Sequence, residues 1–336
     1  MKDFSKQNIE KINKLLGAKK KIVIIGHNNP DGDSVGGSLG LYNVLIKTGN
    51  DVSVIMPSKP NDFLQWLPNQ EDIVVFKEQE KLASRLLEDA EIIFCVDFNS
   101  SHRVDIAQKN LEEAKAIKFL IDHHPEPETD AEFIFSDTIV SSASELVYEF
   151  IKETDLNKFL NKDAATCIFT GIMTDTLNFS VNSSRQETFA IVGELLTYKI
   201  DKDFIYDKVY NNYSINRLKL VGYLLYKKMQ VVEKHGIALI IFTEEEMARF
   251  NFAEGDHEGI VNMPLSVAEI KASIIAVEKD DFVKLSLRSK GEVDVNKLAR
   301  KYFNGGGHKN AAGGKVFTKI SDIEDYIKKS LDEYNF

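Results

Sequence analysis

The first half of the chain alternates short apolar runs with stretches of helical periodicity. Four compact runs rich in β-branched residues predict buried strands at 21–26, 51–56, 91–97 and 116–122. Apolar spacing typical of helices occurs at 34–47 and, between the later strands, at about 78–89 and 104–114. Such alternation is typical of a mostly parallel sheet covered by helices on both faces. The expected fold class is therefore α/β.

The pattern changes beyond residue 142. Helical periodicity continues to 228, and its last part has no partner strand, so we expect a helical linker at 201–229. After it come strand-like 230–242, a helix at 264–267, strands at 270–278 and 281–288, a helix at 294–303 and a Gly-rich loop. We therefore expect one domain at 1–200 and a smaller α/β domain at 230–336.

Composition narrows the class of protein. A chain of 336 residues can build two cores, and 43% apolar with 28% charged residues is a globular balance. No apolar run approaches the roughly 18 residues that span a bilayer, and the first residues do not resemble a signal peptide. We expect a cytoplasmic protein with no membrane partner. The only two cysteines, Cys95 and Cys167, lie in separate apolar segments, which favours buried thiols over a disulfide or a thiolate metal site.

Charge is unevenly distributed. The net charge of −10 argues against binding long duplex DNA. The segment 284–319, however, contains nine basic and two acidic residues. That local excess fits either a solvated basic surface or a binding site for short nucleotides.

Residues that can bind metals stand where the predicted strands end. The candidates are His27, Asp31, Asp33, Asp97, Asp122, His123 and His124, and Asp175 in a predicted loop at 171–176. Because the carboxyl ends of parallel strands meet at one edge of a sheet, we expect these side chains to converge. Pro30 and Gly32 favour a tight turn, so that Asp31 and Asp33 can face two different metals.

The residue types point to the chemistry. Several carboxylates in one crevice are costly unless cations neutralise them. Mixed carboxylate and imidazole ligands suit Mn²⁺ or Fe²⁺, and the lack of thiolates disfavours structural zinc. Each motif also has a simpler interpretation, because Asp31-Gly32-Asp33-Ser34 is typical of a helix N-cap and Asp97 can cap a helix. Their occurrence at four successive element ends favours the metal site.

A second motif lies in the Gly-rich stretch 304–314. Three glycines, Gly305 to Gly307, precede His308 and a run of small residues. A helix C-cap followed by a flexible loop is the simpler interpretation. Bare backbone N–H groups can also approach a phosphate closely, and His308 can donate a hydrogen bond to it.

Together these segments resemble the four motifs of the DHH phosphoesterase superfamily and the Gly-Gly-Gly-His motif of its DHH-associated C-terminal domain. The resemblance covers nearly the whole chain and is greatest to the nanoRNase/pAp phosphatase (NrnA-like) type. It implies two divalent ions, expected to be Mn²⁺, one held by His27, Asp31 and Asp97 and the other by Asp33, Asp97, His123 and Asp175. It also implies that Asp122 orients a histidine and that His124 faces the substrate phosphate as a catalytic group. The substrate-binding residues implied are Arg103, Arg288, Gly305, Gly306, Gly307 and His308. By the same resemblance, the domain at 1–200 would be catalytic, the domain at 230–336 would bind the substrate, and the active site would lie in the cleft between them.

The function implied is metal-assisted hydrolysis of short oligonucleotides, including nanoRNA and dinucleotides, to 5′-mononucleotides, and of pAp to AMP and phosphate. Expected partners are short single-stranded RNA or DNA and nucleotides. Three alternatives stay open: an inorganic pyro- or polyphosphatase, a soluble cyclic- or linear-dinucleotide phosphodiesterase, and a non-catalytic nucleotide-binding regulator. The substrate ranking and the direction of digestion are also open, as is the oligomeric state, for which a homodimer is one option.

Overall fold

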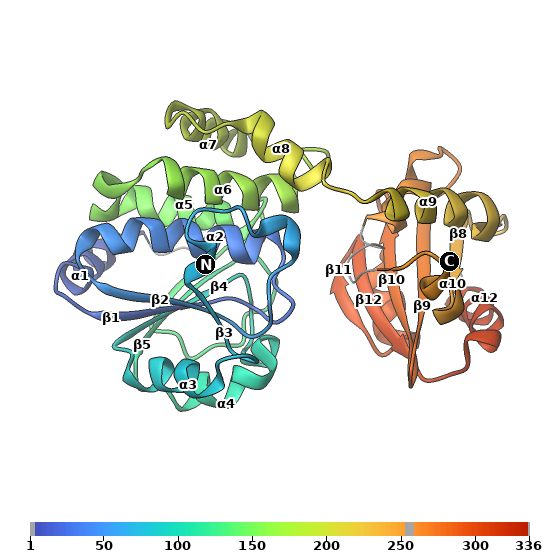
Figure 1. Cartoon of the computed structure of the whole chain (residues 1–336), viewed down its shortest axis with the longest axis horizontal. Coiled ribbons are helices and arrows are strands. Elements are labelled where there is room, and N and C mark those ends of the chain that lie inside the picture. Colours follow the sequence, from blue (N-terminus) through green and yellow to red (C-terminus); the bar gives the residue numbers. More distant parts are fainter. Residues whose placement is uncertain (1–3, 253–258, 335–336) are drawn as a thin grey trace. The chain divides into compact units, whose positions relative to one another are not determined.

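The chain folds into two compact units, Met1–Asn212 and Tyr213–Phe336 (Figure 1). The structure, a computed structural model, describes residues 4–252 and 259–334. The division falls within the stretch 201–229 that the sequence predicts as a linker. Helix α8 (Lys202–Tyr210) belongs to the first unit, and helix α9 (Ile215–Tyr223) belongs to the second.

The first unit is built on a six-stranded sheet of order β3-β2-β1-β4-β5-β6. Every neighbouring pair is parallel. The strands are β1 (Lys21–Ile25), β2 (Asp51–Met56), β3 (Ile73–Val75), β4 (Ile92–Val96), β5 (Ile117–Asp122) and β6 (Phe133–Ser136). The four strands predicted from the sequence are confirmed. The short edge strands β3 and β6 were missed because runs of three and four residues carry little periodicity.

Helices cover both faces of this sheet, as predicted (Figure 1). On one side lie α2 (Gly32–Leu45), α5 (Ala143–Glu153) and α6 (Lys162–Asp175), and on the other α3 (Glu80–Asp89) and α4 (Gln108–Glu113). Strand β1 shows the reason, since Ile22 and Ile24 enter one core while Val23 and Ile25 enter the other. Helices α1 (Lys6–Leu16) and α7 (Gln186–Thr197) complete the unit.

The order of the strands reverses between β1 and β4. Loops that leave the carboxyl ends of these two strands turn toward opposite faces, and in open parallel sheets ligands usually bind at such a point. The loop after β1 is short because α2 starts at Gly32, where the Asp31 carboxylate accepts hydrogen bonds from the backbone N–H groups of Asp33 and Ser34. The loop predicted at 171–176 is wrong, since α6 continues to Asp175.

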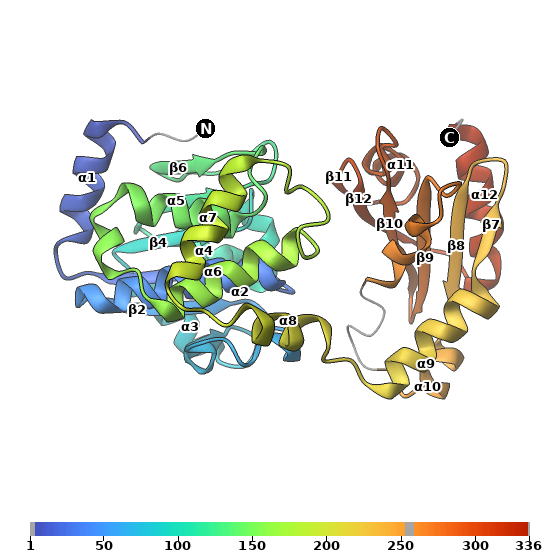
Figure 2. The same ribbon diagram turned by 90° about the horizontal axis from the view of Figure 1, so that it is seen from above.

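The second unit contains a mixed sheet of order β11-β12-β10-β9-β8-β7 (Figure 2). Its strands are β7 (Gln230–Val232), β8 (Ile237–Phe242), β9 (Ala272–Lys279), β10 (Phe282–Ser289), β11 (Gly306–His308) and β12 (Ala311–Val316). Of the strand pairs among the described residues of this unit, β8 with β9 is parallel and the others are antiparallel. Helices α11 (Val295–Tyr302) and α12 (Ile323–Tyr334) pack on one face, and α9 contributes to the apolar cluster of the other.

Three sequence predictions in this unit need correction. The run 230–242 is two antiparallel strands joined by a turn, because Gly236 takes a left-handed φ of 64°. The helix predicted at 264–267 is a longer 3₁₀ helix, Ile260–Ser266. The Gly-rich stretch is not a flexible loop, since β11 and β12 pair as an edge hairpin. A Cβ at Gly305 would collide with the backbone of Gly313, so glycine lets the chain pass close to β12 at that point.

No helix in the ranges 4–252 and 259–334 is long and apolar enough to cross a lipid bilayer. Cys95 and Cys167 are free and buried, as the sequence predicts.

Candidate metal centre

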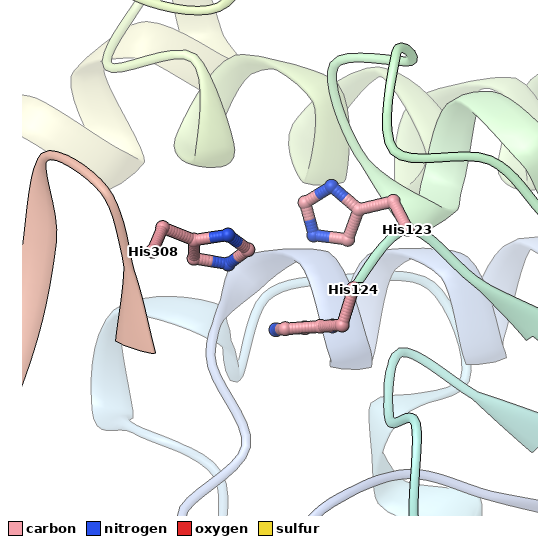
Figure 3. A group of neighbouring side chains, drawn as sticks. All are labelled: His123, His124 and His308. Carbon is pink, nitrogen blue, oxygen red and sulfur yellow. The ribbon is translucent and has the colours of Figure 1, made fainter. Parts of the chain in front are cut away.

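The candidate ligands are delivered by the ends of three parallel strands. His27 follows β1, Asp97 is the first residue after β4, and Asp122 ends β5. Asp97 adopts a left-handed φ of 65°, which is uncommon for a side chain other than glycine and is often a mark of functional constraint. Figure 3 shows His123 and His124 projecting from the segment after β5; the third labelled ring, His308, belongs to the second unit and is described with it below.

The first group of ligands consists of His27, Asp31 and Asp97. His27 Nε2 lies 3.4 Å from Asp97 Oδ2 and 3.8 Å from Asp31 Oδ1. The other ring nitrogen, Nδ1, donates a hydrogen bond of 2.9 Å to the carbonyl oxygen of Asn28. That bond fixes the tautomer and leaves Nε2 to face the two carboxylates as a ligand atom.

The second group consists of Asp33, His123 and Asp175. His123 Nε2 lies 3.9 Å from Asp33 Oδ2 and 3.8 Å from Asp175 Oδ2. It is also 3.6 Å from Asp97 Oδ1. Asp97 therefore presents one carboxylate oxygen to each group, which is the arrangement of a residue that bridges two cations. Asp175 reaches the site as the last residue of α6 rather than from a loop.

Asp122 and His124 form a tight pair beside these groups. Asp122 is fully buried, and its Oδ1 accepts a 2.7 Å hydrogen bond from His124 Nδ1. Its Oδ2 accepts a second bond from the backbone N–H of His124 at 3.1 Å. The carboxylate thus fixes both the ring and the main chain of His124, leaving Nε2 as the ring's remaining polar atom.

The N-terminus of α5 holds Asp33 in place. The backbone N–H groups of Ala143 and Ser144 donate to the two oxygens of Asp33 at 2.6 and 2.8 Å. Gly171 on α6 is required beside them, because a Cβ there would collide with the Ser144 side chain. The positive end of a helix is a favourable place for a carboxylate, so α5 orients this ligand without neutralising it fully.

A buried acid, Glu145, continues this framework. Its side chain is fully buried and accepts bonds from Ser141, from the Thr188 hydroxyl at 2.9 Å and from the Arg185 guanidinium at 2.9 Å. These contacts tie the segment that follows Asp175 to the start of α5. Sequence reasoning missed Glu145 and Arg185, because α5 also carries Glu149, Lys152 and Glu153 and nothing in the pattern marks Glu145 as the buried acid.

The electrostatics of the site call for a cation. Burial, and after it the charge of Asp33, raises the pKa of Asp97 to about 7. Burial and the neighbouring carboxylates, Asp33 first, raise the pKa of Asp175 well above its ordinary value. His27 is buried, which lowers its pKa, but hydrogen bonds to Asp31 and Asp97 raise that pKa to about 10. The site takes up protons where a divalent ion would otherwise supply positive charge.

One atom indicates the fit most directly. Asp97 Oδ1 is buried and has no hydrogen-bond partner among residues 4–252 and 259–334. A buried, unpaired carboxylate oxygen costs free energy unless something else binds it. Oxygen and imidazole donors on every side suit a hard or borderline divalent cation such as Mg²⁺ or Mn²⁺. The residues present therefore fit two metal ions that share Asp97.

The predicted substrate-binding residues belong to both units. Arg103 lies in the first, within the 3₁₀ segment Ser101–Ala107, where its guanidinium makes no hydrogen bond or ion pair with another described residue. In the second unit, Arg288 on β10 lies opposite Ala311 on β12, which in turn lies opposite His308 on β11. Arg288 and His308 thus share one row of the sheet. Burial lowers the pKa of Arg288, whose Nη1 donates to the carbonyl oxygen of Leu287. The predicted cleft between the domains stays a prediction.

Comparison with known proteins identifies the family. The DHH family N-terminal domain matches residues 21–172, and the DHHA1 domain matches residues 236–334. An exopolyphosphatase-related protein from Bacteroides fragilis is 40% identical, with a TM-score of 0.95 over 98% of this chain and 97% of that one. The chain belongs to the DHH family. The resemblance seen in the sequence motifs is confirmed.

Other relatives extend the comparison. The bifunctional oligoribonuclease and PAP phosphatase NrnA of Bacillus subtilis is 29% identical, over 92% of this chain and 95% of that protein. The cyclic-di-AMP phosphodiesterase GdpP of the same organism is 26% identical, over 96% of this chain but only 49% of that protein. Exonuclease RecJ bound to manganese shares the fold, with a TM-score of 0.53 at 14% identity.

Proposed function

We propose that this DHH protein is a two-metal phosphoesterase that hydrolyses short oligonucleotides to 5′-mononucleotides and pAp to AMP and phosphate. The carboxylate of Asp97, with one oxygen facing each ligand group and Oδ1 without a hydrogen bond in the described ranges, is the observation that carries the proposal. The substrate class is drawn from the full-length similarity to the Bacillus subtilis oligoribonuclease and PAP phosphatase. Manganese as the metal, a cytoplasmic location and a homodimer stay predictions.

Each residue has a role in this proposal. His27, Asp31 and Asp97 would hold one ion, and Asp33, His123 and Asp175, with Asp97 shared, the other. When bound, two such ions supply Lewis acidity and an activated water for attack on phosphorus. His124, fixed by Asp122, would donate to the phosphoryl or leaving oxygen. Arg103, Arg288, His308 and the backbone of Gly306 and Gly307 would bind the substrate's phosphates, with Gly305, whose N–H donates to the Ala299 carbonyl oxygen, placing the hairpin.

A second candidate function is hydrolysis of inorganic polyphosphate. The similarity to the exopolyphosphatase-related protein from Bacteroides fragilis favours it. Such an enzyme would release phosphate from inorganic chains without needing a base or ribose.

A parallel hydrolysis assay separates these functions. Purified protein with Mn²⁺ is given a labelled RNA dinucleotide, a five-mer, pAp, cyclic di-AMP, pyrophosphate and polyphosphate. We expect turnover of the dinucleotide, five-mer and pAp to exceed that of the inorganic substrates. Asp97→Asn serves as the inactive variant, and Asp51→Asn, the same change at the exposed start of β2, as the matched control. Preferential release of phosphate from polyphosphate would reject the nucleotide assignment.

A further inference from the structure

Asn28 joins a metal ligand to the turn that contains Arg103. The residue lies between β1 and α2, directly after His27. Its carbonyl oxygen accepts the 2.9 Å hydrogen bond from His27 Nδ1, and its backbone N–H donates to the carbonyl oxygen of Arg103 at 2.8 Å. The main chain of one residue therefore contacts both the metal group and the Arg103 turn.

The side chain of Asn28 makes a further contact with the same turn. Its Nδ2 donates to Asp105 Oδ2 at 3.1 Å, across 77 positions in the sequence. Its Oδ1 is buried and has no partner within the described ranges. Since Oδ1 makes no hydrogen bond there, the bond from Nδ2 to Asp105 is the side-chain hydrogen bond that holds the Asn28 amide in place. In the opposite orientation Oδ1 would face the Asp105 carboxylate, so Asp105 selects the orientation seen.

Asp105 itself has an unusual backbone. Its φ of 48° and ψ of −116° interrupt the helical geometry of the segment Ser101–Ala107. Residues in sparsely populated conformations persist where the surrounding contacts determine them. On either side of Asp105, Val104 and Ala107 are buried, and the N–H of Arg103 donates to the carbonyl oxygen of Ser100. The turn is fixed at both ends, while the Arg103 guanidinium has no hydrogen bond or ion pair with any residue that the structure describes.

We propose that Asn28 and Asp105 are positioning residues that fix the backbone position of Arg103 relative to the metal centre, and with it the direction from which its side chain extends. This rests on the proposed function, in which Arg103 binds a substrate phosphate. The Asn28 main chain fixes His27 and the Arg103 carbonyl together, and its amide holds Asp105 so that the turn cannot tilt away. Neither residue needs to touch the substrate or an ion.

The test is a double-mutant cycle on the intact protein with the labelled dinucleotide. Asn28→Ala keeps both backbone bonds and removes only the amide. We expect KM to rise by about 3- to 10-fold, less than the full cost of a lost hydrogen bond to a charged group because the backbone bonds still hold the turn, with kcat within about 2-fold. The Mn²⁺ concentration giving half-maximal activity should not change, because the His27 contact is retained. Asp105→Ala should match Asn28→Ala, and Asp105→Asn, which keeps an acceptor oxygen, should restore KM.

Non-additivity decides the outcome. In an Arg103→Ala background, Asn28→Ala should raise KM no further, because it acts through Arg103. Asn157→Ala, an exposed asparagine far along the chain, is the control and should behave as wild type. Multiplying effects in the double variant, or an unchanged KM in Asn28→Ala, would overturn the proposal. Absence of any dinucleotide hydrolysis by the wild type would instead reject the proposed function.

Discussion

The metal centre of the first unit and the Gly-rich hairpin of the second differ in burial and in charge. The first brings carboxylates together in a buried place, where burial and mutual repulsion raise the pKa values of Asp97 and Asp175. The second places His308 at an exposed sheet edge, and its glycines are explained by close backbone approach. A cluster that is costly by itself is organised for a cation, whereas an exposed edge strand with nearby cationic side chains is organised for recognition.

The largest effect is expected from removing Asp97, the ligand that both metal groups share. Asp97→Asn keeps the shape but weakens both ligand groups, so we expect kcat to fall by more than the roughly 10- to 100-fold typical of outer-shell substitutions. Steady-state hydrolysis of pAp with Mn²⁺ measures it, with Asp51→Asn as the matched control. In chelator the variant should melt close to wild type, because the change removes both the repulsion from Asp33 and the attraction to His27. Near-normal turnover would show that Asp97 holds no metal.

A smaller effect is expected from the second unit. Arg288→Ala removes a half-buried guanidinium that bonds only to the Leu287 carbonyl among the described residues, so folding should be little affected. If Arg288 binds a phosphate, KM should rise by about 10-fold or more, the usual contribution of a charge-assisted bond. The same kinetics with Lys319→Ala, another member of the basic segment 284–319, provides the control. Equal effects of the two variants would favour a diffuse basic surface over a specific contact.

The smallest effect on catalysis is expected from substitutions of the glycines. Comparing two of these substitutions distinguishes a glycine needed for packing from one that contacts the substrate. Gly305→Ala places a methyl group against the Gly313 backbone, whereas the nearest atom to a Cβ at Gly306 is 3.6 Å away. We expect Gly305→Ala to destabilise the protein by about 1–3 kcal/mol, as overpacking usually does. Gly306→Ala should melt like wild type, and any rise in its KM reports substrate contact. Thermal unfolding of the two variants measures this, and equal melting temperatures would contradict the packing argument.

The sequence predicted the ends of the strands and therefore most of the ligands. Strands β1, β4 and β5 are buried on both faces, so their apolar runs stop abruptly where His27, Asp97 and Asp122 begin. The orientation of those ligands was not predictable. Asp33 is held by backbone N–H groups 110 and 111 positions away, and Asn28 meets Asp105 across 77 positions. Contacts between backbone groups and side chains that are distant in the sequence produce no periodic pattern of apolar and polar residues, so the sequence does not reveal them.

The interpretation of the Gly-rich stretch 304–314 as a flexible loop was wrong for a different reason. Glycine is typical of loops, and Gly305–Gly307 with Gly313 and Gly314 reads as flexible chain. In the structure the same residues allow two strands to pair closely, with Gly307 at a φ of 147°. Local composition cannot distinguish a mobile loop from a tightly packed hairpin, because both need residues without a side chain.

The central claim is that two cations share Asp97. Anomalous diffraction from crystals grown with Mn²⁺ tests it most directly, because each ion gives its own peak. We predict two peaks about 3.5–4 Å apart, one beside His27 and Asp31 and the other beside Asp33, His123 and Asp175, with Asp97 in contact with both. A single peak, or peaks that Asp97 does not touch, would contradict the account.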